Sequence, residues 1–310
     1  MQLKALVRLG ASAAFLAGGY RLWQKAQPQI TQQPDLGIEW SQRLLTRAAP
    51  LVRLPTAPDQ PPDVLADGSG LRCPATGRIY PFHEGVLDLL PDEIVLTETQ
   101  HVLNTPTTAW IYDRFRDMLM RLFGLPEFAV EVTAIQRALR VEPGDVLLDL
   151  ACGHGNFTVE WAKRIGSAGL VIGLDISPAM LARAATHVNR WGLENVLLIR
   201  GDALRLPLAD RGITKVNCSG GFHQLPDLNQ ALREIARVSA PGATLTASTF
   251  AAGPNDRRAA LKDWFRRHFA LHFVPLAELD EPLAALGYSE YRWSLSGEWF
   301  GYLAAQRSQA

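Results

Sequence analysis

The chain has 310 residues, more than a typical single domain, and 47% of them are hydrophobic, enough for a sizeable core. Lysine and arginine together number 31, as do aspartate and glutamate, so no overall positive field would attract a nucleic acid. The three cysteines lie far apart, which indicates a reducing compartment and gives no structural zinc pattern. We therefore expect a cytoplasmic protein with no metal site and no nucleic-acid partner.

The first segment, residues 1–25, is a hydrophobic leader. Residues 3–23 are rich in apolar and small side chains, with Lys4 and Arg8 before the apolar run and Arg21 after it. The run is shorter than the roughly 20 apolar residues of a confident membrane-spanning helix. It predicts a helix that lies on a membrane or spans it marginally, with a disordered or targeting leader as the equal alternative. The first alternative would bring the protein to the membrane surface.

Five prolines between residues 50 and 62 follow the leader and indicate an extended linker over residues 26–70. Residues 71–91, LRCPATGRIYPFHEGVLDLLP, then resemble a small zinc-ribbon-like module. Cys73 occupies the first cysteine position of its CPxC knuckle, but Thr76 occupies the second. One thiol with His83 cannot complete a tetrahedral zinc site, so we expect a metal-free remnant of two or three short strands.

Amphipathic helices are expected in residues 92–140. Apolar side chains recur at helical spacing over residues 110–123, and a second helical pattern over residues 131–140 ends before Pro143 and Gly144. These residues would form a helical cap ahead of the rest of the chain.

Residues 146–150, VLLDL, are a near-continuous apolar run that predicts a strand buried in a parallel sheet. Gly153 and Gly155 follow, where the backbone must turn or a ligand must approach closely, and a helical pattern covers residues 157–165. The third glycine position of a dinucleotide fingerprint is Thr158, which disfavours a nicotinamide cofactor. The unit of strand, glycine loop and helix predicts a ligand site at the end of the strand.

Three more strands are expected at residues 170–174, 196–199 and 215–219. Asp175 ends the first of them at the distance from the glycine loop that places a carboxylate beside the ribose of a bound nucleoside. Its alternative role is that of an acid at a helix N-terminus, since Ser177 and Pro178 open the next helix. Asp202 and His223 follow the other two strands.

The pattern Asp149-x-Ala151-x-Gly153-x-Gly155, the acid Asp175 and the segment Gly201-Asp202-Ala203 resemble class I S-adenosylmethionine-dependent methyltransferases. The similarity is greatest to the type that methylates carbon in ubiquinone and menaquinone biosynthesis (methyltransferase type 11 domain). In that family the loop usually has glycine where this chain has Ala151. Similar proteins also carry a ribbon module and helices that cap the cofactor ahead of the core.

The resemblance implies an α/β fold: a Rossmann-like seven-stranded sheet with helices on both faces over residues 141–306, with a helical and small β extension before it. It also implies S-adenosyl-L-methionine as cofactor, with Asp149 and Gly153 at its methionyl end, Asp175 at the ribose and Asp202 at the adenine amino group. The full set of expected cofactor-binding residues is Asp149, Ala151, Gly153, Gly155, Asp175, Ile176, Asp202, Ala203 and Ser219.

His223 is the expected catalytic residue. It matches the first histidine of a loop in these methyltransferases, and Gln224 replaces the second. An imidazole with its ordinary pKa of ~6.5 could take the proton from a phenolic or enolic acceptor, whereas the alternative is a loop histidine bonded to backbone.

The function that we expect is methyl transfer to a small, apolar acceptor such as a quinol or lipid. A sulfonium donor is already activated, so a site without a catalytic triad or metal suffices. Two alternatives remain open: a non-catalytic scaffold that binds the cofactor, and a nucleotide-dependent dehydrogenase.

Overall fold

The computed structural model describes residues 37–91, 94, 105, 127–252, 259–269 and 272–309. The leader at residues 1–25 and the amphipathic pattern at residues 110–123 lie outside the described residues. Within the part that the structure describes, no helix has the length and apolar character needed to cross a membrane. The expected membrane association depends on residues 3–23, which also lie outside the described residues.

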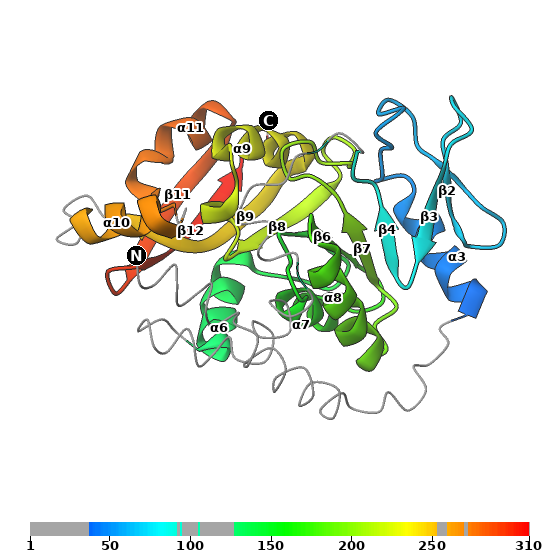
Figure 1. Ribbon diagram of the computed structural model, residues 1–310, viewed down its shortest axis with the longest axis horizontal. Coiled ribbons are helices and arrows are strands. Elements are labelled where there is room, and N and C mark those ends of the chain that lie inside the picture. The colour runs from blue at the N-terminus through cyan, green and yellow to red at the C-terminus, as the bar shows by residue number, and fades with distance from the viewer. Residues whose placement is uncertain are drawn as a thin grey trace.

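One twelve-stranded sheet runs through the described residues (Figure 1). Its strands in chain order are β1 (Asp63–Val64), β2 (Gly70–Arg72), β3 (Ile79–His83), β4 (Val86–Asp88), β5 (Val146–Leu150), β6 (Leu170–Asp175), β7 (Val196–Arg200), β8 (Ile213–Ser219), β9 (Ser239–Ala252), β10 (Val274–Pro275), β11 (Tyr288–Ser296) and β12 (Phe300–Arg307). The order across the sheet is β1-β2-β3-β4-β7-β6-β5-β8-β9-β12-β11, and β10 pairs with β9.

The expected seven strands form the larger part of this sheet, from β7 through to β11. Strands β7, β6, β5, β8 and β9 are parallel neighbours, whereas β12 pairs antiparallel with both β9 and β11. The last two strands of the chain thus form an antiparallel pair at the end of the sheet. The sheet has more strands than the expected seven because the small strands β1 to β4 join it. Strand β4 pairs with β7 in parallel, with Val86 opposite Leu198. Since β7 would otherwise be an exposed edge, this pairing satisfies its free backbone groups.

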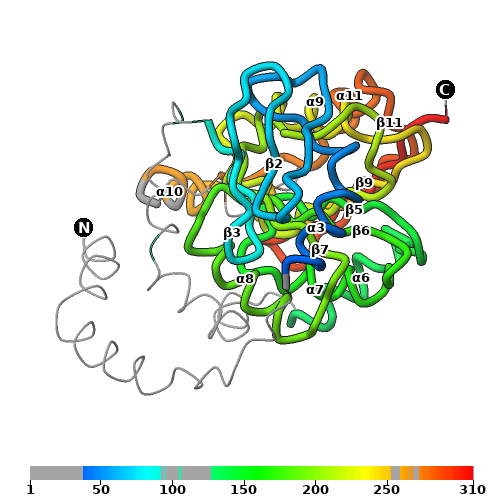
Figure 2. The backbone as a smooth tube through the Cα atoms, turned by 90° about the vertical axis from the view of Figure 1, so that its right-hand side faces the viewer, coloured from blue at the N-terminus to red at the C-terminus, as the bar shows by residue number. Residues whose placement is uncertain are grey.

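Helices cover both faces of the sheet, as expected. They are α3 (Gly37–Ala48), α6 (Phe128–Leu139), α7 (Asn156–Ile165), α8 (Pro178–Arg190), α9 (Leu228–Val238), α10 (Ala259–Phe269) and α11 (Asp280–Ala285). Figures 1 and 2 show α6, α7 and α8 together on one side of the sheet and α9 and α11 on the other.

Alternation along the strands builds a separate core on each face. Leu148 and Leu150 of β5 belong to one buried cluster, whereas Leu147 belongs to the other, with α6, α7 and α8. Because successive side chains of a strand point to opposite faces, an uninterrupted apolar run is what a strand covered on both faces needs.

The extended linker predicted over residues 26–70 is wrong from residue 37 onward. Residues 37–48 form α3, whose Trp40, Leu44 and Leu45 are buried in the main core cluster. These side chains recur at helical spacing, a signal that the prolines after residue 49 obscured. Near the end of the chain, a 3₁₀ turn over Leu276–Glu278 precedes the six-residue α11.

Candidate active site

The glycine loop, residues 151–155, connects the carboxyl end of β5 to the start of α7. The amide of Cys152 donates to the carbonyl of Leu174 at 3.0 Å, which attaches the loop to the neighbouring strand β6. Ala151, Gly153 and Gly155 all have positive φ, at 53°, 55° and 82°. Glycine is favoured at these positions because it adopts left-handed backbone without strain. The same conformation costs about 1–2 kcal/mol at Ala151.

Gly153 and Gly155 serve different purposes. A Cβ atom at Gly155 would lie 2.8 Å from the Cβ of Ala184 on α8, so this glycine allows helix α8 to pack closely. A Cβ atom at Gly153 would meet nothing within 4 Å. The loop therefore leaves open space beside Gly153, as a backbone that receives a ligand requires.

Asp175 ends β6 next to this loop. Its Oδ2 accepts the amide of Gly153 at 2.8 Å and its Oδ1 accepts the amide of Ser177 at 2.9 Å. Burial raises the pKa of Asp175 above its ordinary value, while these two amides act in the opposite direction. Each carboxylate oxygen has a second lone pair, so the group can still accept from two hydroxyl donors.

Ser177 caps α8, since its side chain accepts the amide of Met180 at 3.2 Å. Ser177 is therefore the N-cap of α8, and Asp175 accepts the amide of Ser177 just ahead of the helix. Ile176 lies between the two, and its carbonyl accepts from the guanidinium of Arg200 at 3.4 Å.

Asp202 follows β7, the next strand across the sheet. The amide of Gly201 donates to the carbonyl of Asp175 at 3.1 Å, so the ends of β6 and β7 are held together. Asp202 Oδ1 accepts the amide of Leu204 at 2.9 Å, which closes a tight turn around Ala203. The other carboxylate oxygen, Oδ2, takes no part in this turn, so Asp202 can accept a hydrogen bond from a ligand.

Asp149 lies beneath the loop rather than on its surface. Only 1% of the residue is exposed, Thr158 donates to its Oδ2 at 2.6 Å, and Asn217 donates to its Oδ1 at 2.8 Å. Burial raises the pKa of Asp149 to about 6, these two hydrogen bonds oppose the shift, and the charge of Asp175 adds to it. The carboxylate thus connects β5 with α7 and β8.

Ser219, at the end of β8, continues this buried polar network. Its hydroxyl donates to Asn217 Oδ1 at 3.0 Å, so the side chain turns toward the interior. On β9, Ser248 donates to the buried Glu131 of α6 at 2.6 Å. Thr158, Asn217 and Glu131 were not among the expected site residues. A polar side chain inside an apolar strand or helix face, such as Asn217 in β8, was the available signal.

His223 is buried in a short 3₁₀ turn after β8. Its Nδ1 lies 3.2 Å from the hydroxyl of Thr249, and its Nε2 lies 3.5 Å from the amide nitrogen of Gln224. Because the Thr249 hydroxyl donates onward to the Phe250 carbonyl, we assign the proton of His223 to Nδ1. Burial, together with the nearby His272, lowers the pKa of His223 from 6.5 to about 3. The imidazole is therefore neutral at pH 7.

Aromatic rings gather beside His223 at the same edge of the sheet. The ring centroid of Phe250 lies 4.8 Å from that of His223 and 5.9 Å from that of Phe273, and Phe273 lies 5.8 Å from Trp299. Lys262 of α10 is only 5% exposed; its Nζ donates to the carbonyl of Ala251 at 2.7 Å and lies 5.1 Å from the Phe273 centroid. The sequence did not single out this lysine.

The expected cofactor residues come together along one edge of the sheet. Asp202, Asp175, Gly153 and Ser219 follow β7, β6, β5 and β8, which are consecutive neighbours. The carboxyl ends of parallel strands form the usual ligand edge of an open α/β sheet. The acceptor groups at Asp202 and Asp175 and the open space at Gly153 fit an elongated nucleoside such as S-adenosylmethionine.

Residues 147–242 match the model of a methyltransferase domain family. The demethylmenaquinone methyltransferase of Geobacillus stearothermophilus is 33% identical over 159 residues, which are 51% of this chain and 65% of that protein. The enzyme of the same name from Bacillus mycoides is 33% identical over 157 residues, 51% of this chain and 63% of that protein. The chain thus spans just under two thirds of the length of these curated relatives.

Solved structures show the same fold. A SAM-dependent methyltransferase from Aquifex aeolicus superposes with a TM-score of 0.51 at 21% identity, covering 65% of this chain and 98% of that one. Phosphoethanolamine N-methyltransferase 2 of Haemonchus contortus has a TM-score of 0.58 at 14% identity, over 71% of this chain and 62% of its own. The motifs at the strand ends, the match of residues 147–242 to a methyltransferase domain and the sequence relatives all agree with a fold of the class I S-adenosylmethionine-dependent methyltransferase type.

Proposed function

We propose that this protein transfers a methyl group from S-adenosylmethionine to a small, apolar aromatic acceptor of the quinol type. The observation that carries the proposal is the row of Asp202, Asp175, Gly153 and Ser219 at four neighbouring strand ends. The similarity to demethylmenaquinone methyltransferases over 159 residues supports the quinol class of acceptor.

Each cofactor residue has a role that follows from its chemistry. Asp175 would accept the ribose hydroxyls, and Asp202 would accept from the adenine amino group while the amide of Ala203 serves the ring. The backbone at Gly153 would lie against the methionyl end, and Ile176 would line the nucleoside. When bound, the cofactor supplies a methyl group on a sulfonium, an electrophile that needs no further activation. The chain need only position the acceptor and exclude water.

We assign Asp149 a supporting role behind the loop. Both of its oxygens accept hydrogen bonds from Thr158 and Asn217, and the residue is 1% exposed. A carboxylate in this position fixes the turn from β5 into the loop, so it would act on the methionyl end through Ala151 and Gly153 rather than by direct contact.

The acceptor would lie against the aromatic rings of Phe250, Phe273 and Trp299. Flat rings prefer offset or edge contacts with other rings, and this cluster sits at the sheet edge of the cofactor loops. His223 adjoins Phe250 and would help to orient the acceptor. With a pKa of about 3 it is a weak base, which disfavours removal of the acceptor proton by His223 itself.

Isothermal titration of the full chain with S-adenosylmethionine and S-adenosylhomocysteine tests the cofactor site. Micromolar binding is expected in the wild type, and a loss of at least tenfold in Asp175→Ala. Asp145→Ala is the matched control, because both oxygens of Asp145 also accept hydrogen bonds but at the opposite edge of the sheet. Equal affinity in all three proteins would contradict the assignment of the site.

Transfer of labelled methyl groups tests the acceptor. Incorporation into a demethylmenaquinol with a short side chain, and none into phosphoethanolamine, is the expected result. Cofactor binding without transfer to any acceptor in a cell extract would favour the non-catalytic scaffold, and binding of NAD in place of S-adenosylmethionine would favour the dehydrogenase.

A further inference from the structure

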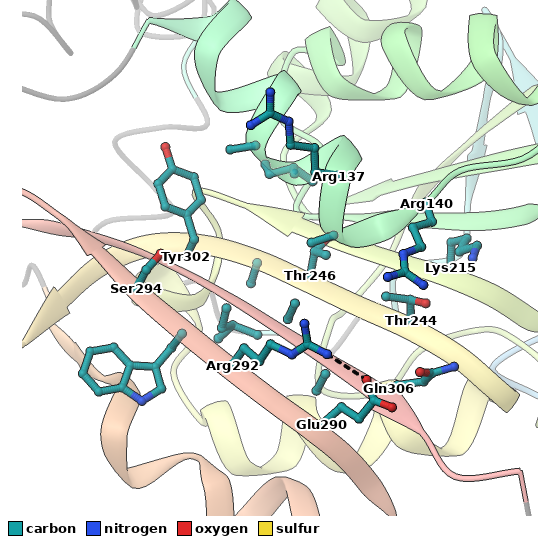
Figure 3. Close-up of a pocket in the computed structure, with 18 of the residues that line it drawn as sticks. Arg137, Arg140, Lys215, Thr244, Thr246, Glu290, Arg292, Ser294, Tyr302 and Gln306 are labelled. Atoms are coloured by element: carbon teal, nitrogen blue, oxygen red, sulfur yellow. Dashed lines mark hydrogen bonds and ion pairs between the residues drawn. The ribbon is translucent and has the colours of Figure 1, made fainter.

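A hollow lies on the face of the sheet that carries α6 (Figure 3). Its volume is about 490 Å³, within the range of small-molecule sites. Its walls come from the C-terminal half of α6 and from β8, β9, β11 and β12. Lys215 of β8 and Thr244 of β9 both line it. The two residues lie opposite each other near the start of the parallel pairing of these strands. The expected cofactor residues lie at the carboxyl ends of β5, β6, β7 and β8, so the hollow is a separate site.

Positive side chains outnumber negative ones around this hollow. The cationic side chains are Arg137, Arg140, Lys215 and Arg292, and the anionic ones are Glu142 and Glu290. Arg292 Nη2 lies 3.0 Å from Glu290 Oε2, so this pair offsets one charge of each sign. The remaining cations come from α6 and β8, and they leave an excess of positive charge in a chain whose overall net charge is zero.

Arg140, Lys215 and the Arg292–Glu290 pair lie toward one side of the hollow, whereas Arg137 lies apart from them, nearer Tyr302 (Figure 3). In Figure 3, Arg140 extends from the end of α6 toward the strands, where Lys215, Thr244 and Arg292 lie. Tyr302 of β12 stands at the other side, and the buried Ile135 of α6 lines the space between helix and sheet. The hollow therefore has a basic, hydroxyl-bearing part and a less polar part.

The helix dipole explains only some of this arrangement. Arg137 and Arg140 lie at the C-terminal end of α6, where cations are favourable in any helix. Lys215 and Arg292 are on strands, which have only small net dipoles, and lie far from each other in sequence. Arg140 and Lys215 are both positive and come from two different elements, so their charges repel one another, and a bound anion would relieve that repulsion.

We propose that this hollow binds an organic phosphate, with its phosphate group between Arg140 and Lys215. Guanidinium groups bind phosphate oxygens with paired hydrogen bonds, and a multiply charged anion matches the positive excess better than a single carboxylate does. The hydroxyl of Thr244 adds a donor at the same end. The volume exceeds that of a phosphate group, so the organic part would extend toward Ile135 and Tyr302. This site is independent of the proposed methyl transfer.

Titration of the full chain with inorganic pyrophosphate in about 0.15 M salt tests the proposal. We expect saturable binding that weakens at least tenfold in Arg140→Gln combined with Lys215→Gln. Arg190→Gln is the matched control, since Arg190 is an exposed arginine at the end of α8, away from the hollow. Thermal unfolding of each variant checks that the fold is kept, which the exposed positions of Arg140 and Arg190 favour.

Two sources of phosphate are separated by a second arm. Vesicles of phosphatidylcholine with and without phosphatidic acid are sedimented with the wild type and the double variant. Loss of phosphatidic acid binding in the double variant identifies a lipid headgroup, whereas pyrophosphate binding without vesicle binding identifies a soluble phosphate. The proposal is overturned if the wild type binds neither probe, or if the double variant and Arg190→Gln bind both as the wild type does.

Discussion

The hydroxyl of Thr158 donates a hydrogen bond of 2.6 Å to Asp149 Oδ2. Thr158 occupies the position at which a dinucleotide fingerprint has its third glycine, so the residue that departs from that fingerprint supports the acid at the end of β5. Both residues are buried, and Asn217 supplies the second donor to the same carboxylate. The loop that carries Gly153 therefore rests on a satisfied, solvent-free polar group.

Thr158→Val should destabilise the protein by about 1–3 kcal/mol, because a buried carboxylate oxygen loses its donor while the side-chain shape is kept. The loss should be greater at pH 8 than at pH 5, since Asp149 is ionised above its pKa of about 6. Urea unfolding at both pH values measures this. Thr158→Ser keeps the hydroxyl and should stay within about 1 kcal/mol of the wild type; an equal loss in both variants would contradict the role of the hydrogen bond.

Asp149→Asn should change how stability depends on pH. The pKa of Asp149 is raised to about 6 in the folded protein, from 3.8. Protonated Asp149 therefore stabilises the folded protein fully below pH 3.8. This contribution is lost as the pH rises through 6, and stability does not change further at higher pH. An amide cannot ionise, so the variant should gain about 3 kcal/mol relative to wild type between pH 4 and pH 7. Parallel unfolding profiles over this range would show that Asp149 keeps an ordinary pKa.

Gly153→Ala and Gly155→Ala should separate ligand approach from packing. Both introduce a side chain at positive φ, which costs about 1 kcal/mol. At Gly155 the new methyl also meets Ala184 at 2.8 Å, so this variant should lose more stability. At Gly153 the methyl enters open space, so that variant should lose mainly affinity for S-adenosylmethionine. Calorimetric titration and thermal unfolding of both variants check this, and the reverse ranking would overturn it.

Ala151→Gly should raise the free energy of unfolding by about 1 kcal/mol. Ala151 has a φ of 53°, where alanine is strained and glycine is not. The Ala151 methyl also packs against the main core cluster, so its loss offsets part of the gain. Chemical denaturation measures the change; a destabilised variant would mean that the Ala151 methyl contributes more than its strain costs.

His223 should not produce a step in the pH profile of methyl transfer near pH 6.5. Its pKa of about 3 means that the imidazole stays neutral from pH 5 to pH 8. Because this pKa is lowered, the neutral ring contributes stability above pH 6.5 that is lost as the pH falls toward 3. The free energy of unfolding should therefore fall less between pH 6 and pH 4 in His223→Gln than in the wild type. A rate step at pH 6.5 that disappears in His223→Gln would restore the general-base role.

The sequence determined the central fold because its signals are local. The apolar runs of β5 and β7 and the caps around Ser177 specify strands and helices through the period and geometry of their own backbone. Glycine at positions 153 and 155 likewise fixed where the ligand loop lies, since positive φ is a property of single residues.

Only the tertiary structure decided which side chains meet. The addition of β4 to β7, the burial of α3, and the contacts of Asp149 with Thr158 and Asn217 join residues far apart in the chain. Burial, a property of the packed molecule, also sets the pKa of His223 at about 3, where the sequence suggested about 6.5. Likewise, the basic hollow beside Arg140 exists because α6 lies over strands that follow it in sequence.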